Sequence, residues 1–246
     1  MHKFEIVNAL LRKNNCRSYL EICTPSTGGK FTRIDKTQLR VYHRLMYRCP
    51  RDFEDGEEIT FRSEGDGLQH QLDPAMPYDL VFVDPFHTFE CSMRDLQAAH
   101  SVGSVIVVHD CCPPHRDLVS PSFHPGSWCG VTYRAYIEFV LSHPDVSYCT
   151  VDTDYGCGVI KKDPEQESIR AESYRELLEL WSFAKERNPD MFEFFFQHRD
   201  RFLKLISVED FLSREGIQRS SAARLWWKVC NSPHTMAAIL RRTLNA

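Results

Sequence analysis

Long apolar segments are scarce in this chain of 246 residues. No run reaches the roughly eighteen apolar residues that a membrane-spanning helix needs. Residues 1–14 carry neither the apolar core nor the small-residue cleavage site of a secretory signal. We therefore expect no membrane partner and a cytoplasmic location, where the ten cysteines stay reduced.

Basic residues do not outnumber acidic ones in this chain. The chain holds 30 Lys and Arg residues against 34 Asp and Glu residues, a formal net charge of -4. Binding to nucleic acid depends on clustered basic residues and on the counterions that they release. The balance of charge therefore predicts no nucleic-acid partner.

Internal repeats and low-complexity tracts are absent, and the content of 42% hydrophobic and 26% charged residues is that of an ordinary globular protein. Short apolar runs alternate with helical patterns, which predicts an α/β fold. We expect a doubly wound, Rossmann-like sheet of seven strands, parallel except for a terminal antiparallel β-hairpin. The expected strands are 18–23, 41–47, 59–62, 78–84, 104–110, 146–151 and 157–161, with helices near 4–11, 89–99 and 133–141.

The character of the sequence changes after residue 162. Tyr174, Leu177, Leu178, Trp181 and Ala184 recur at helical spacing, and further helices are expected near 192–202, 208–213 and 222–244. We therefore divide the chain into a Rossmann-like domain at 1–162 and a C-terminal helical extension at 163–246. Assembly of a homo-oligomer through these helices is left open.

Several motifs resemble those of class I S-adenosylmethionine-dependent methyltransferases, in particular a subgroup that acts on small molecules. Tyr19-Leu20-Glu21-Ile22 before a glycine-bearing loop resembles the first motif of that family. Phe82-Val83-Asp84-Pro85-Phe86-His87-Thr88-Phe89-Glu90 is similar to its fourth-strand motif, and Val108-His109-Asp110-Cys111-Cys112-Pro113 to its fifth-strand motif. Segments 126–130 and 151–160 are similar to later parts, and the resemblance spans about residues 4–162.

This resemblance implies an enzyme that transfers a methyl group from S-adenosylmethionine to a hydroxyl of a small molecule or saccharide. The cofactor would then bind at the ends of the first, third and fourth strands. The implied cofactor-binding residues are Glu21, Thr24, Ser26, Thr27, Gly28, Gly29, Asp66 and Asp84.

Two departures from the family pattern support a second hypothesis. Pro25 and β-branched residues stand in the first loop where the family has glycines, and residues 45–50 contain no acid for the ribose hydroxyls. The alternative is a non-catalytic binding or scaffold protein with a degenerate cofactor loop.

The ends of the fourth and fifth strands supply the candidate catalytic residues Asp84, His87, His109 and Asp110. Ligands of open α/β sheets bind beyond the carboxyl ends of the strands, so these side chains should share one crevice. Paired carboxylates bind a divalent cation such as magnesium or accept a proton, and histidine is a general base near neutral pH. The alternative is that the acids only cap loops and that each histidine is structural.

A third hypothesis is a metal-dependent hydrolase that uses His109, Asp110 and His115. Zinc bound by a set drawn from His109, Cys111, Cys112, His115, His124 and Cys129 is also conceivable. Adjacent cysteines fit poorly with the usual spacing of zinc ligands. Trp128 and Tyr155 either wall a substrate pocket or belong to the core.

Overall fold

The computed structural model describes residues 1–24, 33–47, 61–64, 72, 75, 77–187 and 190–217. The chain divides into two compact units, Met1–Val208 and Glu209–Ala246. The boundary expected after residue 162 falls inside the first unit and stays a prediction. The expected helix at 222–244, like Ser26, Thr27, Gly28, Gly29 and Asp66, lies outside the described residues.

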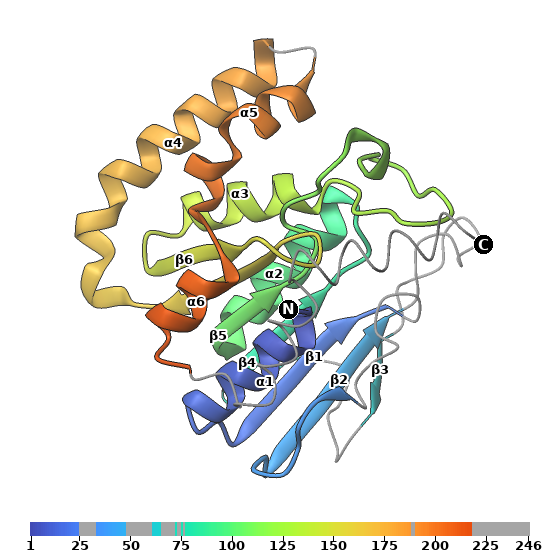
Figure 1. Ribbon diagram of the computed structural model, residues 1–246, viewed down its shortest axis with the longest axis vertical. Coiled ribbons are helices and arrows are strands. Elements are labelled where there is room, and N and C mark those ends of the chain that lie inside the picture. Colours follow the sequence, from blue (N-terminus) through green and yellow to red (C-terminus); the bar gives the residue numbers. More distant parts are fainter. Residues whose placement is uncertain are drawn as a thin grey trace, which may run out of the picture. The chain divides into compact units, whose positions relative to one another are not determined.

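The first unit is an α/β structure built on one mixed sheet (Figure 1). The strand order is β3-β2-β1-β4-β5-β7-β6-β8. The strands are β1 (Ser18–Cys23), β2 (Val41–Tyr47), β3 (Phe61–Glu64), β4 (Tyr78–Asp84), β5 (Gly103–Val108), β6 (Val146–Val151), β7 (Cys157–Lys162) and β8 (Leu205–Ile206).

The central strands run parallel, as expected: β1 pairs with both β2 and β4, and β4 pairs with β5. The predicted hairpin is confirmed, since β7 is antiparallel to both β6 and β5. Two expectations were wrong. The third strand runs antiparallel to β2, and β8 adds an eighth strand parallel to β6, so the sheet has more than the seven strands predicted.

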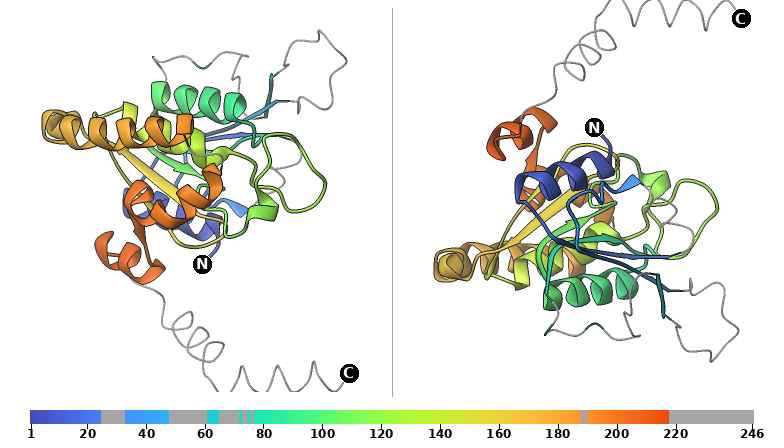
Figure 2. Two further views of the ribbon diagram at one scale, coloured as in Figure 1. Left: turned by 90° about the horizontal axis from the view of Figure 1, so that it is seen from above. Right: turned by 90° about the horizontal axis from the view of Figure 1, so that it is seen from below.

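Helices cover both faces of the sheet (Figure 2). On one face lies α1 (Lys3–Lys13), whose Ile6, Val7, Leu10 and Leu11 are fully buried. On the other face lie α2 (Phe89–Val102) and α3 (Thr132–Ser142), which pack against each other. Strand β4 is apolar on both sides because both of its faces are covered, as in other parallel sheets.

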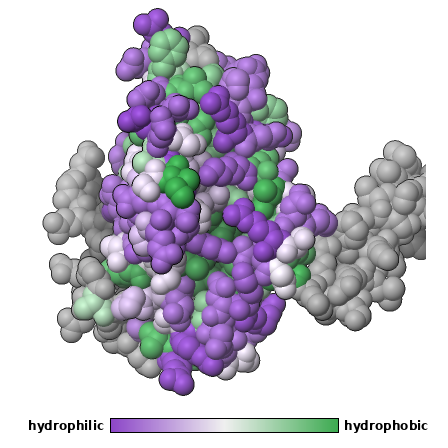
Figure 3. Space-filling view, turned by 90° about the vertical axis from the view of Figure 1, so that its left-hand side faces the viewer, coloured by the Kyte–Doolittle hydropathy of each residue, from purple (hydrophilic) through white to green (hydrophobic). Residues whose placement is uncertain are grey.

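Two further helices complete the first unit, α4 (Glu167–Arg187) and α5 (Met191–Leu203). The buried stripe of α4 is Tyr174, Leu177, Trp181 and Ala184, and the helix packs on α3. The face of the molecule seen in Figure 3 is mostly hydrophilic. Ile169 and Phe183 are exposed apolar side chains of α4. The spacing of apolar residues therefore predicted the buried side of α4 correctly.

In the second unit, α6 (Val208–Arg214) begins at the boundary, and Phe211 and Leu212 are its buried residues. Of the helices that the structure describes, none is both long and apolar enough to cross a membrane. The described cysteines are all free and buried.

Candidate functional site

Four separate segments of the first unit bring charged side chains to one place. Asp84 is the last residue of β4, and His109 and Asp110 follow β5 directly. Lys3 begins α1, Asp154 lies in the turn between β6 and β7, and His87 lies in the loop between β4 and α2. We call these six residues the acid–histidine cluster.

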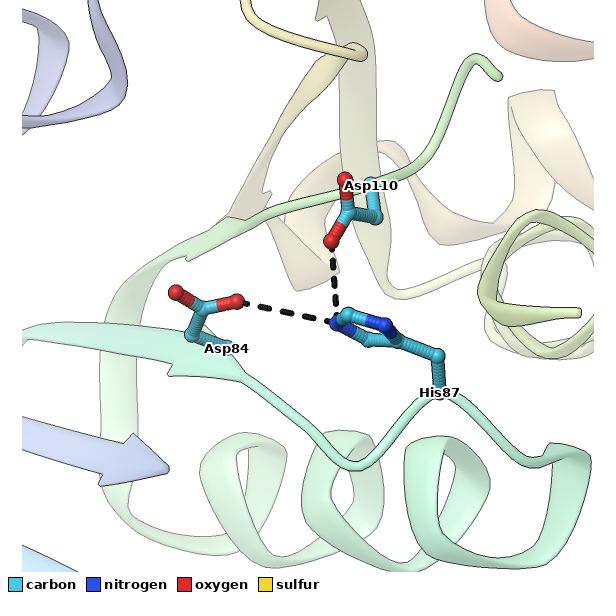
Figure 4. A group of neighbouring side chains, drawn as sticks. All are labelled: Asp84, His87 and Asp110. Carbon is cyan, nitrogen blue, oxygen red and sulfur yellow. Dashed lines mark ion pairs between the residues drawn. The ribbon is translucent and has the colours of Figure 1, made fainter. Parts of the chain in front are cut away.

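His87 faces both strand-end carboxylates of this cluster (Figure 4). Its Nε2 atom lies 2.9 Å from Oδ2 of Asp110 and 3.9 Å from Oδ1 of Asp84. One ligand atom from each of the three residues lies within 4.8 Å of the others. Among the described residues, this is the group whose geometry suits a metal ion.

The ring nitrogens of His87 strengthen that interpretation. The residue is only 7% exposed, and neither Nδ1 nor Nε2 makes a hydrogen bond of acceptable geometry. Buried polar atoms usually have a hydrogen-bond partner, so an exception needs an explanation. Nε2, which faces two carboxylates, suits a shared cation. Nδ1 has no hydrogen-bond partner among the described residues, unlike the second nitrogen of most metal-ligating histidines.

The same two carboxylates also contact a lysine and the second histidine, whose Nδ1 atom lies 3.3 Å from Oδ1 of Asp84. Nζ of Lys3 donates a hydrogen bond of 2.7 Å to Oδ2 of Asp84 and lies 3.1 Å from Nδ1 of His109. The same Nδ1 atom is 3.0 Å from Oδ2 of Asp110. Nε2 of His109 is 3.6 Å from Oδ2 of Asp154. The cluster is therefore a continuous network of opposite charges.

Burial and charge act in opposite directions on the pKa values of this network. Burial lowers the pKa of His87, but the charges of Asp110 and Asp84 outweigh it and raise that pKa to about 9. For His109 the same balance, with Asp110 foremost, raises the pKa well above its ordinary value. Burial raises the pKa of Asp84, but His109 and Lys3 outweigh it and hold that pKa well below its usual range. The carboxylates therefore favour the protonated forms of both histidines.

The backbone of the loop after β5 takes an uncommon conformation at the site. Asp110 has a φ of +60°, in the left-handed region that few residues other than glycine adopt. The loop is held there by hydrogen bonds from the N–H groups of Cys111 and Cys112 to the carbonyls of Gly156 and Tyr155. Strained residues of this kind concentrate at functional sites. The turn ends the strand before His109, two residues earlier than expected.

A glycine fixes the position of His87. Gly130 has a φ of +55°, and a Cβ atom there would lie 2.0 Å from the carbonyl oxygen of His87. The N–H of Val131 donates to that same carbonyl over 2.8 Å. The Trp128 ring packs beside the imidazole, with 5.2 Å between the ring centroids. The loop that contains Trp128, Gly130 and Val131 therefore packs against His87 and fixes the position of its backbone and its ring.

Glu21 lies in β1, next to β4, and only 1% of it is exposed. Its Oε2 accepts a hydrogen bond of 3.2 Å from the hydroxyl of Tyr19. Burial raises the pKa of Glu21 to about 7, and the charge of Asp84 acts in the same direction. Glu21 and Asp84 therefore place two carboxyl groups where β1 and β4 meet, and burial favours the neutral form of Glu21.

The structure thus brings together Asp84, His87, His109 and Asp110, and it places Glu21 and the fully buried Thr24 on the neighbouring strand and just after it. His115 and His124, from the zinc and hydrolase hypotheses, are exposed and do not belong to the cluster. Trp128 is buried against His87, whereas Tyr155 is 39% exposed beside His109.

Sequence reasoning missed Lys3, Asp154 and Gly130. Lys3 stands one residue before the apolar stripe that predicted α1, so nothing local marked its side chain as buried. Asp154 lies within the segment 151–160 that was noted for its resemblance, and Gly130 ends the segment 126–130. Gly130, which follows Trp128 and Cys129, was the one available signal, because glycine often stands where two backbone segments approach closely.

Comparison of the sequence with models of known protein families gives no match, and comparison with curated proteins gives none.

Proposed function

We propose that the protein is an S-adenosylmethionine-dependent methyltransferase that acts on a hydroxyl of a small molecule or saccharide. The observation that carries the proposal is the convergence of Asp84, His87 and Asp110 at the carboxyl ends of β4 and β5. Ligands of open α/β sheets bind at this edge, where the strand order reverses. Here the order reverses between β1 and β4, beside Glu21 and Asp84.

The order of the strands also supports the proposal. A parallel centre followed by an antiparallel hairpin, with β7 between β5 and β6, fits the layout that the sequence motifs imply. Helices on both faces agree with a doubly wound, Rossmann-like fold, which we include in the proposal. The antiparallel β3 departs from that layout at the side of the sheet where the motifs imply adenine binding.

The residues of the site fit S-adenosylmethionine and a divalent cation to different degrees. S-adenosylmethionine would supply the methyl group, and a cationic sulfur bound beside the carboxyl groups of Glu21 and Asp84 would favour their ionised forms. Thr24 is the other described residue of the expected cofactor set. A divalent cation such as magnesium or manganese would be held by Asp84, His87 and Asp110, where it would acidify an acceptor hydroxyl.

The side chains of the site have separate roles in methyl transfer. Methyl transfer to oxygen needs the acceptor in line with the methyl donor and a group that accepts a proton. Asp84 and Asp110 orient the hydroxyl, because both carboxylates face the same point beside Nε2 of His87 (Figure 4). His109 accepts the proton at Nδ1, which lies 3.0 Å from Oδ2 of Asp110 and 3.3 Å from Oδ1 of Asp84, and Asp154, 3.6 Å from Nε2, stabilises the imidazolium. His109 becomes an acceptor once the carboxylate charges beside it are compensated, since these charges raise its pKa.

Calorimetric titration with S-adenosylmethionine and with its demethylated product, with and without magnesium or manganese, tests the proposal. We expect dissociation constants on the order of micromolar, the range in which many enzymes hold their substrates. Glu21→Gln should weaken binding at least tenfold, on the order of the loss from one buried charged contact. Glu90→Gln, an exposed acid of α2, is the matched control and should bind as the wild type does.

Absence of binding at millimolar ligand, from protein shown to be folded, would contradict the proposal and favour the scaffold hypothesis. The hydrolase hypothesis gains less from the geometry, because its third residue, His115, is exposed outside the cluster.

A further inference from the structure

The first turn of α1 places a lysine on one of the carboxylates of the proposed cation site. Nζ of Lys3 contacts Oδ2 of Asp84 at 2.7 Å, while Oδ1 of the same carboxylate lies 3.9 Å from Nε2 of His87 and 3.3 Å from Nδ1 of His109. The Lys3 side chain is only 9% exposed, so this contact is shielded from water. One carboxylate is thus shared between a resident ammonium group and the position that suits a metal.

The same turn covers the cluster. Asp84, His87 and Asp110 are all buried, and a cation needs a path to its ligands. Residues 1–3 are held by polar contacts to the turn between β6 and β7. The N–H of Lys3 donates 3.0 Å to Oδ2 of Asp154, Nδ1 of His2 lies 3.3 Å from that oxygen, and the hydroxyl of Thr153 donates to the carbonyl of Met1.

The rest of α1 is anchored differently. Phe4, Ile6 and Val7 are buried against the sheet, and the Phe4 ring meets that of Phe82 edge to face, at 5.8 Å. Withdrawal of residues 1–3 therefore breaks these polar contacts and the stacking of the His2 ring on Phe4, and leaves the packing of the helix against the sheet in place.

We propose that Lys3 competes with a divalent cation for Asp84, so that entry of the cation releases Lys3 and detaches residues 1–3 from Asp154. This inference rests on the cation site of the proposed function. Its physical basis is repulsion, because an ammonium and a dication on one carboxylate lie a few ångströms apart in a buried, low-dielectric setting. The contact of residues 1–3 with Asp154 then depends on whether a cation occupies the site.

Another role for Lys3 would be to orient Asp84 toward the cation, as residues behind a metal ligand often do. Loss of such a residue weakens metal binding about 10-fold to 100-fold. The two roles predict opposite signs. If repulsion dominates, removal of the ammonium group strengthens binding of the cation. We expect this sign, because the Coulomb repulsion between the ammonium group and a dication at this distance exceeds the orienting effect.

Titration of the full chain with manganese(II), followed by calorimetry and by the electron paramagnetic resonance signal of the free ion, measures the sign. We expect Lys3→Met to bind manganese at least about tenfold more tightly than the wild type, since it keeps the side-chain length without the charge. Lys3→Arg keeps the charge and should bind as weakly as the wild type. Lys13→Met, an exposed lysine of the same helix, is the matched control and should change nothing.

Hydrogen exchange on the wild type gives a second measurement that needs no variant. Saturating manganese should speed exchange of the Lys3 amide, which donates to Asp154, and leave Val7 and Leu10 protected. Weaker or equal binding by Lys3→Met would overturn the proposal. If that variant does not fold, an unchanged Lys3 amide in the wild type would overturn it.

These outcomes are separate from those of the proposed function. Tighter manganese binding by Lys3→Met in a protein that binds no S-adenosylmethionine would support the competition and contradict methyl transfer. Absence of manganese binding by every folded variant would overturn the competition, whatever the result with S-adenosylmethionine.

Discussion

Gly130 is the residue at which one added methyl group should disturb the site most. A Cβ atom there would lie 2.0 Å from the carbonyl oxygen of His87 and 2.6 Å from the Cβ of His87. Both distances are far shorter than any van der Waals contact. Gly130→Ala must therefore displace the segment that carries His87.

The magnitude follows from three contributions. Alanine in the left-handed region costs about 1–2 kcal/mol. Displacement of the His87 carbonyl breaks its hydrogen bond with the N–H of Val131, which adds about 1 kcal/mol or more in a buried setting. Relief of the contact adds strain of about 1–2 kcal/mol, as overpacking does elsewhere. We expect Gly130→Ala to lower the free energy of unfolding by about 3–5 kcal/mol, which is large for one substitution.

Gly126 provides the matched control. Its φ is +101°, but a Cβ atom there would meet nothing within 4 Å. Gly126→Ala therefore includes only backbone strain, about 1–3 kcal/mol. Urea unfolding of both variants gives the difference, expected to be about 2 kcal/mol. Equal unfolding free energies would refute the reasoning, because they would show that the contact with His87 relaxes without cost.

Three further predictions concern other parts of the first unit. Since burial raises the pKa of Glu21 to about 7, the folded chain holds this proton more tightly than the unfolded one, and stability should fall as pH rises from about 4.5 to about 7. Glu21→Gln removes that dependence, so urea unfolding should find it equal to the wild type at low pH and about 3 kcal/mol more stable at pH 8; a difference independent of pH would count against this account. Trp181→Ala removes a fully buried ring between α4 and α3 and should cost about 3–5 kcal/mol, whereas Phe183→Ala, at an exposed position of α4, should change stability by about 0.5 kcal/mol or less; similar losses in thermal unfolding would show that α4 packs by another face. Thr88→Ala removes the oxygen that accepts the N–H of Cys91 at the start of α2 and should cost about 1 kcal/mol, which Thr88→Ser should restore in the same assay.

The sequence predicted the central strands because their signals are local. Runs of apolar residues that end in Asp84 and in His109-Asp110 identify strands buried on both faces, and these are β4 and β5. The hairpin of β6 and β7 followed from a short connection rich in turn residues. Since the carboxyl ends of neighbouring parallel strands meet, the proximity of Asp84 to Asp110 could also be predicted.

The direction of β3 and the role of Lys3 could not be predicted in this way. A strand carries the same alternation whether it runs parallel or antiparallel, so direction depends on tertiary pairing. Lys3 is a charged residue at the start of an amphipathic helix, a position that is usually solvated. Its burial follows from Asp84 and His109, which lie more than eighty residues away along the chain and are paired with it only by the fold.

The central claim is that Asp84, His87 and Asp110 form a cation-binding site rather than a purely structural ion network. An anomalous difference map from crystals of the protein grown with manganese tests it most directly. The account predicts a peak within bonding distance of Nε2 of His87 and of both carboxylates, about 2.1–2.3 Å from each ligand atom, with Lys3 displaced from Asp84. A map without that peak, in which Lys3 still contacts Asp84 and His87 still contacts Asp110 directly, would contradict the claim.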